Sequence, residues 1–260
     1  MDAGGNPDET AQYRLLGDDT PVDDGVLDRL YDYPPAPQRC VVRGNMIASL
    51  DGAATTDGTS GGLGGAGDRR LFALQREMAD VIVVGAGTAR AENYGGARMT
   101  AAQRQRRGLR GQSEVPPIAL VTRSGVIEPS LRVLTDSEVR PLILTCTAAA
   151  AAARARVGSA AEVVDCSRAD PGQVDLGAAL HLLAGRGLLR VLTEGGPSLL
   201  GAFIAAQLLD ELCLTSAPLL VGGSAVRIAV GLDAVGTPMQ RAHVLTDADD
   251  YLYTRHVRAG

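Results

Sequence analysis

The chain contains no lysine, because all 25 of its basic residues are arginines. This absence excludes chemistries that depend on a lysine amine. They include Schiff-base catalysis, the lysine of P-loop nucleotide sites and the lysine that assists the tyrosine of short-chain dehydrogenases. A Rossmann-type short-chain dehydrogenase is therefore excluded, and the glycine spacing of the chain does not match its fingerprint either.

Paired cysteines are also absent. The four cysteines form no Cys-x-x-Cys pair, and the three histidines lie far apart in the sequence. Zinc sites need closely spaced ligands, so this spacing excludes a zinc-type site. We expect small buried thiols in a reducing cytoplasm. The cysteines are Cys40, Cys146, Cys166 and Cys213, and the histidines are His181, His243 and His256.

No apolar run approaches the length of a membrane span. The N-terminus is acidic and has neither a basic start nor an apolar block, so it does not resemble a secretory signal. The net charge is −5, and a strong basic face is missing. The arginine-rich stretch "AAQRQRRGLRGQ" is predicted to be a solvated loop or helix. We therefore expect a cytoplasmic protein with no membrane or nucleic-acid partner.

The sequence divides at a proline-rich boundary, "YDYPPAPQR". Residues 1–38 are predicted to be a leader that is flexible or draped over the core, with a short helix in "VLDRLYDY". Residues 39–260 are predicted to form a single domain, because a chain of 260 residues with 45% hydrophobic content can build one large core.

From residue 40 onward, strand-like and helix-like segments alternate, which predicts an α/β fold with a mostly parallel central sheet and helices on both faces. The strand-like segments are continuous apolar runs, as expected for strands buried on both sides. Residues 243–258 are expected to close the domain as an edge strand or a hairpin. Predicted strands are 40–49, 80–87, 117–122, 141–145, 161–165, 188–196 and 210–223, and predicted helices are 69–78, 148–156, 175–185 and 197–209.

The stretch "RVLTEGGPSLLGAFI" predicts a buried strand, a Gly195-Gly196-Pro197 turn and an apolar helix. Glycine lets the backbone approach a ligand closely, and proline suits the first helical position. Ser198 and the N–H groups of Leu199 and Leu200 would then suit a phosphate, helped by the helix dipole. The alternative is an ordinary tight turn between a strand and a helix.

Two further turns follow predicted strands. "VVGAGTAR" contains Gly85, Gly87 and Thr88, and two glycine turns in one sheet favour a dinucleotide cradle. "VTRSG" places Thr122, Arg123 and Ser124 where the sheet exposes its carboxyl edge. An arginine beside hydroxyls suits a 2′-phosphate and favours NADPH, although a solvated arginine in a turn explains this stretch equally well.

Another strand ends in "NMIASLDG", where Ser49 and Asp51 suggest either an Asx-type turn or the edge of a site. The glycine-rich loop that follows contains Ser60 and could close over a ligand.

The stretches "ASLDG", "VGAGTARAEN" and "TEGGPSLLGAFIAAQLLDEL" with "APLLVGG" occur in this order and at the expected separations. Together they resemble the reductase half of the riboflavin-biosynthesis deaminase–reductase, from about residue 39 to the C-terminus. The resemblance implies a dihydrofolate-reductase-like fold and a homodimer. No stretch resembles the zinc signature of the deaminase half, so the resemblance implies a stand-alone reductase domain.

This resemblance implies NADPH-dependent reduction of 5-amino-6-(5-phosphoribosylamino)uracil to its ribitylamino product, with hydride transfer to C1′ of the open-chain imine. The substrate-binding residues it implies are Ser60, Arg76, Arg98 and Glu194. The candidate cofactor residues, from the turns and the resemblance together, are Ile47, Gly85, Gly87, Thr88, Glu92, Thr122, Arg123, Ser124, Gly195, Gly196, Pro197, Ser198, Leu199 and Leu200.

Glu194 stands one residue before the glycine turn, although an anion site there would repel an acid. We interpret it as pointing to the opposite side, toward the hydride acceptor, as the catalytic carboxylate that binds an N–H edge or stabilises an iminium. The alternative is a glutamate that bonds local backbone N–H groups.

Several positions depart from the family pattern. Asn45 stands where many bacterial relatives have lysine, Tyr94 replaces a proline, and Arg98 is only the nearest candidate for the phosphate-binding arginine. These departures lie on the substrate side, so two alternatives stay open. One is dihydrofolate reductase activity on the same scaffold. The other is a non-catalytic NADPH-binding sensor.

Overall fold

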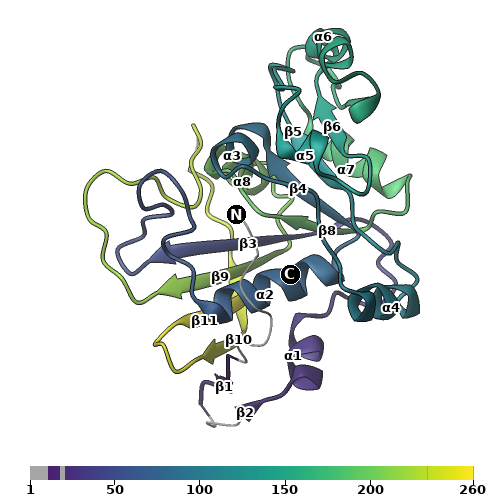
Figure 1. Ribbon diagram of the computed structural model, residues 1–260. Helices are drawn as coiled ribbons and strands as arrows, with labels where there is room; N and C mark the ends of the chain where they lie inside the picture. The colour runs from purple at the N-terminus through teal and green to yellow at the C-terminus, as the bar shows by residue number, and fades with distance from the viewer. Residues whose placement is uncertain (1–10, 18–20, 233, 260) are drawn as a thin grey trace.

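The computed structural model describes residues 11–17, 21–232 and 234–259, and an eleven-stranded sheet runs through this part of the chain (Figure 1). Its strand order is β2-β1-β10-β11-β9-β3-β8-β4-β5-β6-β7. Neighbours from β9 to β7 are parallel and the other pairs are antiparallel, which confirms the mostly parallel α/β sheet. The strands are β1 (Tyr13–Leu15), β2 (Pro21–Val22), β3 (Val41–Ser49), β4 (Val81–Gly85), β5 (Ile118–Val121), β6 (Leu142–Thr145), β7 (Glu162–Asp165), β8 (Arg190–Thr193), β9 (Glu211–Ala217), β10 (Met239–Thr246) and β11 (Leu252–Arg258).

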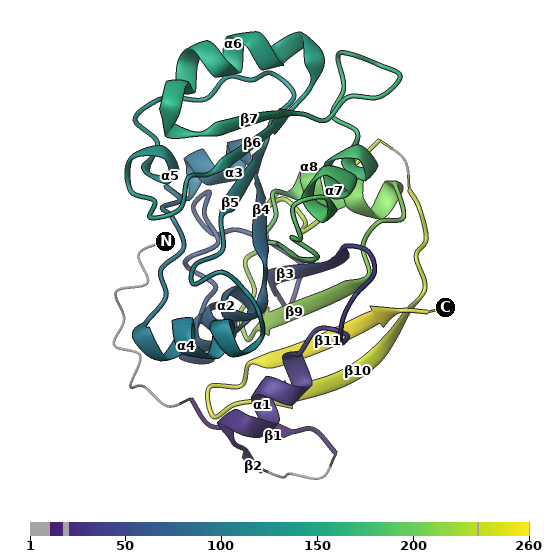
Figure 2. The ribbon, with the colours of Figure 1, turned by 90° about the vertical axis from the view of Figure 1, so that its right-hand side faces the viewer.

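Helices cover both faces of the parallel part (Figure 2). Successive side chains of β4 alternate between two cores: Val81 and Val83 pack with α7 and α8, whereas Ile82 and Val84 pack with α3 and α5. This two-sided burial explains the continuous apolar runs in the sequence. The helices are α1 (Asp24–Tyr31), α2 (Ala66–Met78), α3 (Ala86–Ala91), α4 (Ala101–Leu109), α5 (Arg132–Thr135), α6 (Thr147–Val157), α7 (Leu176–Ala184) and α8 (Pro197–Ala205), and η1 (Gly158–Ala160) is a short 3₁₀ helix.

The antiparallel part contains the closing hairpin. β10 pairs with β11 and β11 pairs with β9, so the hairpin alternative is confirmed. The hairpin is not at the edge of the sheet, because β1 pairs with β10 and β2 pairs with β1. Strands of three and two residues are too short to show a hydrophobic period, so no sequence pattern predicts them.

The described part of the N-terminal leader is built into the fold. Tyr13, Tyr31 and Tyr33 are buried in a core cluster with side chains of α2, β10 and β11. The expected short helix is α1, which begins after Asp23, whose carboxylate accepts from Val26 N. Residues 1–10 and 18–20 lie outside the described residues, and a division of the chain at residue 38 stays a prediction.

Two arginines of the core hold the end of α1. Arg43 is fully buried, and its guanidinium donates to Glu211 Oε2 at 2.7 Å and to the Tyr31 carbonyl at 2.6 Å. Arg255 donates to the Leu30 carbonyl at 2.7 Å and to Glu211 Oε1 at 2.9 Å. The last carbonyls of a helix have no partner within it, so these bonds satisfy them and anchor the leader.

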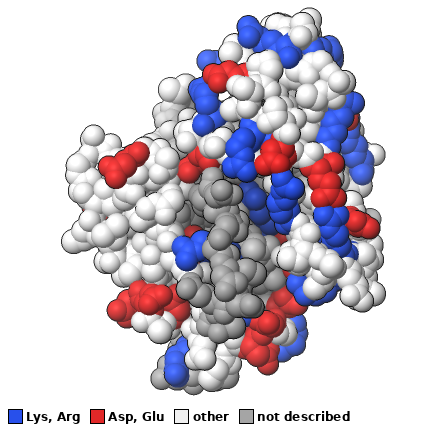
Figure 3. All heavy atoms as spheres, viewed as in Figure 1, with Lys and Arg blue, Asp and Glu red and all other residues white. Residues whose placement is uncertain are grey.

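The arginine-rich stretch forms α4, one of the two alternatives expected for it, but one of its arginines is not solvated. Arg107 is fully buried and donates to the carbonyls of Ser113, Glu77 and Ala79. Over this side of the molecule, arginine and acidic side chains are interleaved (Figure 3). The ion pair of Arg104 with Glu138 at 2.6 Å is one example.

All four cysteines are free and buried, as the sequence predicts. Burial raises the pKa of Cys40 and Cys213 to about 11 and that of Cys166 to about 12. These thiols therefore stay protonated and are poor nucleophiles near neutral pH. No helix within the described residues is long and apolar enough to cross a membrane.

Candidate functional site

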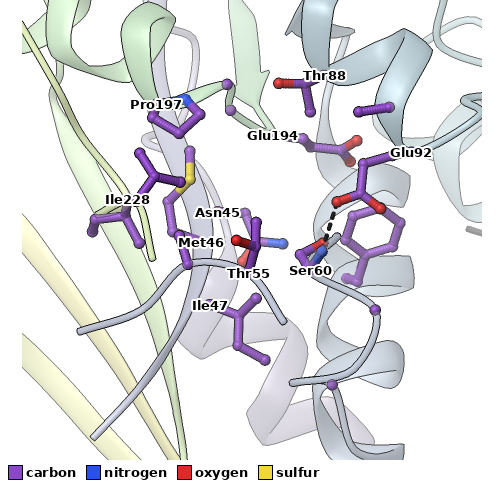
Figure 4. Close-up of a pocket in the computed structure, with 18 of the residues that line it drawn as sticks. Asn45, Met46, Ile47, Thr55, Ser60, Thr88, Glu92, Glu194, Pro197 and Ile228 are labelled. Atoms are coloured by element: carbon purple, nitrogen blue, oxygen red, sulfur yellow. Dashed lines mark hydrogen bonds between the residues drawn. The ribbon is translucent and has the colours of Figure 1, made fainter. Parts of the chain in front are cut away.

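A gap opens in the sheet where β8 stops. β3 pairs with β8 only as far as the Gly44–Thr193 pair and then continues beside β9 to Ser49. Beyond Thr193 the chain turns away, and the Gly195 carbonyl accepts a hydrogen bond from Gly85 N at 2.9 Å. A cavity of about 490 Å³ lies at this carboxyl edge (Figure 4). Ligands of open α/β sheets bind at such edges.

The Gly-Gly-Pro turn forms one wall of this cavity. Gly195 and Gly196 have φ values of +95° and +62°, where an L side chain is strained. A Cβ on Gly196 would also lie 2.7 Å from Thr88 Oγ1. Gly196 caps α8 without a side-chain bond, and Pro197 stands in the first turn. Within the described residues the cap of α8 supplies no side-chain acceptor, so the N–H groups at the start of this helix suit an anion.

Glu194 lies across the cavity from Pro197 (Figure 4). Both of its carboxylate oxygens accept from Arg76, through Nε and Nη2, each at 2.7 Å. Only 1% of the Glu194 side chain is exposed. The carboxylate is paired with Arg76, another residue that the family resemblance assigns to the substrate. A contact of Glu194 with the hydride acceptor stays a prediction.

Aromatic rings enclose this ion pair. The Arg76 guanidinium lies 4.2 Å from the centre of the Phe72 ring. Burial alone would lower the pKa of Arg76, but Glu194 and Tyr94 together outweigh burial and the pKa is raised. Tyr94 lines the cavity, and burial followed by the charge of Glu194 raises its pKa well above the ordinary value. Tyr94 therefore keeps its proton near neutral pH.

Asp68, at the start of α2, lines the same cavity. Burial raises the pKa of its carboxyl group, while a hydrogen bond with Thr215 and the charge of Arg69 act in the opposite direction. Sequence reasoning missed Asp68. A signal was present, because the glycines just before it let the helix start approach β11: a Cβ on Gly67 would lie 2.2 Å from the Tyr253 hydroxyl.

Ser60 and Glu92, predicted for the substrate and the cofactor respectively, meet in the structure. Ser60 N donates to Glu92 Oε1 at 2.7 Å, and both residues line the cavity (Figure 4). This bond ties the glycine-rich loop after β3 to the end of α3.

Asn45 projects from β3 into the cavity, and its amide oxygen accepts from Gln75 Nε2 at 2.9 Å. Gln75 lies behind it on α2 and is only 1% exposed.

The loop after β9 supplies an apolar wall through Val226 and Ile228. Asp51 holds this loop, because its carboxylate accepts from Gly222 N at 2.6 Å and from Val221 N at 3.2 Å. The Ser49 hydroxyl and these two N–H groups lower the pKa of Asp51 to about 2. Asp51 is thus a loop anchor whose carboxylate binds a segment distant in sequence, whereas an Asx-type turn would bind the backbone two residues further on.

Nine of the predicted site residues line the cavity. They are Ile47, Ser60, Gly87, Thr88, Glu92, Glu194, Gly195, Gly196 and Pro197. Gly85 and Arg76 lie just behind this lining, through their bonds to Gly195 and Glu194. Ser198, Leu199 and Leu200 form the first turn of α8, and the two leucines are buried in the core.

The other predicted residues lie outside the lining. Arg98 is two-thirds exposed and forms an ion pair with Asp136. Thr122, Arg123 and Ser124 follow β5, beyond β4 from the cavity. Thr122 is buried and accepts from Gly125 N at 3.2 Å, whereas Arg123 and Ser124 are exposed.

Lining residues that sequence reasoning did not assign come mostly from the two loops and α2. The pattern gave no signal for the apolar ones, since single valines and isoleucines in loops carry no period. They are Asn45, Met46, Ala54, Thr55, Gly58, Gly61, Gly64, Asp68, Arg69, Phe72, Ala91, Tyr94, Val226 and Ile228.

A glycine turn followed by a helix, at the carboxyl edge of a mostly parallel α/β sheet, is a place where nucleotides bind. The chain belongs to the RibD C-terminal domain family, whose pattern it matches over residues 41–253.

Two relatives carry the name 2,5-diamino-6-ribosylamino-4(3H)-pyrimidinone 5′-phosphate reductase. The one from Methanothermobacter thermautotrophicus is 30% identical over 210 residues, which cover 77% of this chain and 91% of the relative. The one from Archaeoglobus fulgidus is 27% identical over 180 residues, covering 69% of this chain and 80% of the relative.

Among solved structures, a pyrimidine reductase-like protein from Corynebacterium diphtheriae aligns with a TM-score of 0.75 at 25% identity. The alignment covers 85% of this chain and 92% of that protein. These relationships support an oxidoreductase of the riboflavin pathway.

Proposed function

We propose that the protein is an NADPH-dependent reductase that acts on C1′ of a ribosylamino-pyrimidine 5′-phosphate. The observation that carries this proposal is the cavity itself, with a helix start suited to an anion on one wall, and with the arginine-paired Glu194 and the carboxyl group of Asp68 also in its lining. The family supports the reaction class.

The cavity fits a dinucleotide on structural grounds. A Cβ at Gly196 would clash with Thr88, so this position requires glycine. Without a side chain there, a ligand can approach the backbone of the turn closely. We propose that Gly195 to Ser198 and Thr88 hold the pyrophosphate, and that Ile47 lines the nicotinamide end. When bound, NADPH supplies the hydride. Arg123 would pair with the 2′-phosphate at the exposed end of β5.

The acceptor needs a proton as well as a hydride. When C1′ of the imine gains hydride, the electron pair of the C=N bond moves to nitrogen, and that nitrogen takes up a proton. We propose Asp68 as its source, because burial raises the pKa of this carboxyl group. Glu194 accepts two hydrogen bonds from Arg76, and we propose that this pair orients the acceptor. Replacement of Asp68 by asparagine should lower turnover and leave NADPH binding unchanged.

A second candidate acceptor is dihydrofolate. The specific observation that favours it is the position of Arg98, which pairs with Asp136 outside the cavity lining. The substrate phosphate then lacks the arginine that the family resemblance implies for it. Asp68 would also suit a pterin ring, since that acceptor too needs a proton at a C=N bond.

Purified protein should be tested for NADPH oxidation with three acceptors in parallel. They are 5-amino-6-(5-phosphoribosylamino)uracil, the 2,5-diamino-pyrimidinone phosphate after which the relatives are named, and dihydrofolate. Turnover of either pyrimidine supports the proposal and identifies the acceptor. Turnover of dihydrofolate alone overturns it in favour of the second candidate. NADPH binding without any turnover would favour a sensor. A homodimer and a cytoplasmic location stay predictions.

A further inference from the structure

A buried glutamine interrupts the apolar face of α2. Leu71, Leu74 and Met78 on this face pack into the core, and Gln75 lies among them with 1% exposure. Helical spacing puts an apolar residue at such a position. A polar side chain there calls for a specific explanation.

Only one end of the Gln75 amide is hydrogen-bonded. Its Nε2 donates to Asn45 Oδ1 at 2.9 Å, but its Oε1 has no hydrogen-bond partner in the described part of the chain. A buried carbonyl without a partner loses the hydrogen bonds it made to water, so an apolar side chain of similar length would be more stable here. Stability therefore does not explain why an amide occupies position 75. The remaining explanation is its hydrogen bond to Asn45.

That bond decides which end of the Asn45 amide faces the cavity. Because Gln75 presents a donor, Asn45 turns its oxygen toward α2 and its NH₂ group toward the cavity. In Figure 4 this nitrogen points to the side where Ser60 and Glu92 lie. The other polar side chains on that side include the carboxylates of Glu92 and Glu194, which only accept.

We propose that Gln75 is a positioning residue that holds Asn45 as a hydrogen-bond donor for a carbonyl oxygen of the bound ring. A pyrimidinone-type ring presents a carbonyl next to an N–H, so it needs a donor beside an acceptor. Asn45 supplies the donor and the carboxylates supply the acceptors. This inference rests on the proposed function of the cavity as a substrate site.

The test uses Gln75→Glu and Gln75→Met, with Gln103→Glu as the matched control. An ionised carboxylate at position 75 accepts instead of donating, so the Asn45 amide should turn over and present its oxygen to the ring. We expect kcat/KM for the acceptor to fall about tenfold to a hundredfold at pH 8, since a donor has become an acceptor. At low pH the carboxyl group is protonated and donates again, so activity should recover.

The two companion variants separate positioning from a merely structural role. Gln75→Met leaves Asn45 free to rotate and should give a smaller loss that does not depend on pH. Gln103→Glu makes the same change of charge in the exposed capping box of α4 and should match wild type. A Gln75→Met variant with wild-type kcat/KM, or a Gln75→Glu pH profile parallel to wild type, overturns the inference. If Gln75→Glu does not fold, Gln75→Met alone decides.

Neutron diffraction of the wild-type protein gives a readout without turnover, because it distinguishes the amide nitrogen from the oxygen. Asn45 Oδ1 facing Gln75 supports the inference, and Nδ2 facing Gln75 overturns it. If no acceptor is reduced while Asn45 shows the expected orientation, the proposed function fails and the positioning stands.

Discussion

Replacing Glu194 by glutamine keeps the shape of the side chain and removes the charge that Arg76 binds through two 2.7 Å hydrogen bonds. Removal of one partner from a buried ion pair costs about 3–5 kcal/mol, because the other charge stays behind. Glutamine keeps one acceptor, and the Phe72 ring still faces the guanidinium at 4.2 Å. We therefore expect Glu194→Gln to lower the free energy of unfolding by about 2–3 kcal/mol.

Arg76→Met should cost more, near the upper end of that range, because it leaves the carboxylate of Glu194 in a site where its side chain is only 1% exposed. The double variant should be no less stable than Arg76→Met, since it removes the stranded charge. Urea denaturation of the four proteins gives the coupling between the two residues. If the losses of the two single variants sum to the loss of the double variant within about 0.5 kcal/mol, the two residues do not act as a unit.

Turnover provides the second measurement on the same variants. Glu194→Gln should lower kcat while the Kd for NADPH stays nearly unchanged, because the Glu194 carboxylate binds Arg76 on α2 and not the N–H groups at the start of α8. A collapse of NADPH binding would contradict this placement of Glu194.

Three further perturbations test other parts of the structure. Arg123→Ala should weaken NADPH about tenfold to a hundredfold and leave NADH unchanged, as expected for loss of a charge-assisted bond to the 2′-phosphate; equal losses for both cofactors would refute that assignment. Gly196→Ala should destabilise the protein by about 1–3 kcal/mol, because φ at this position is +62°, and should weaken NADPH; wild-type behaviour in a thermal melt and a binding titration would contradict the cradle. Burial, followed by the charges of Arg255 and Arg43, lowers the pKa of His243 from 6.5 to about 4. The folded protein therefore binds this proton less readily than the unfolded chain, so up to about 3 kcal/mol of stability should be present above pH 6.5 and lost as the pH falls toward 4. Denaturation of wild type and His243→Gln across this range measures the contribution, and a constant difference between them would rule it out.

The sequence predicts the parallel sheet well because its strands are buried on both faces. Such strands appear as continuous apolar runs, and the glycine turn after β8 has a clear local cause in its positive φ values. The position of β3 relative to β8 cannot be predicted from a local sequence pattern. The cavity depends on β3 extending past the Gly44–Thr193 pair, and only the assembled sheet determines that offset.

Predictions based on charge alone were less successful, because ion pairs form between segments that are distant in sequence. Arg107 was expected to be solvated, but backbone carbonyls of the segments before β4 and after α4 surround it. Arg98 is the nearest candidate for the phosphate-binding arginine of the family, and it forms an ion pair with Asp136; its contact with a substrate stays a prediction. Glu194 and Arg76 were each assigned to the substrate, and their pairing with each other could not be deduced from separate motifs.

The absence of lysine limits which residue can protonate a substrate. Among the residues that the structure describes, no histidine lines the cavity, and an arginine does not release its proton at physiological pH. Tyr94 keeps its proton because its pKa is raised well above the ordinary value, and Glu194 is occupied by Arg76. Glu92 accepts from Ser60. Asp68 is then the lining group best placed to hold and release a proton, since burial raises its pKa while Arg69 and Thr215 limit the increase. We therefore propose different roles for the two carboxyl groups, because Arg76 pairs with Glu194 whereas desolvation raises the pKa of Asp68.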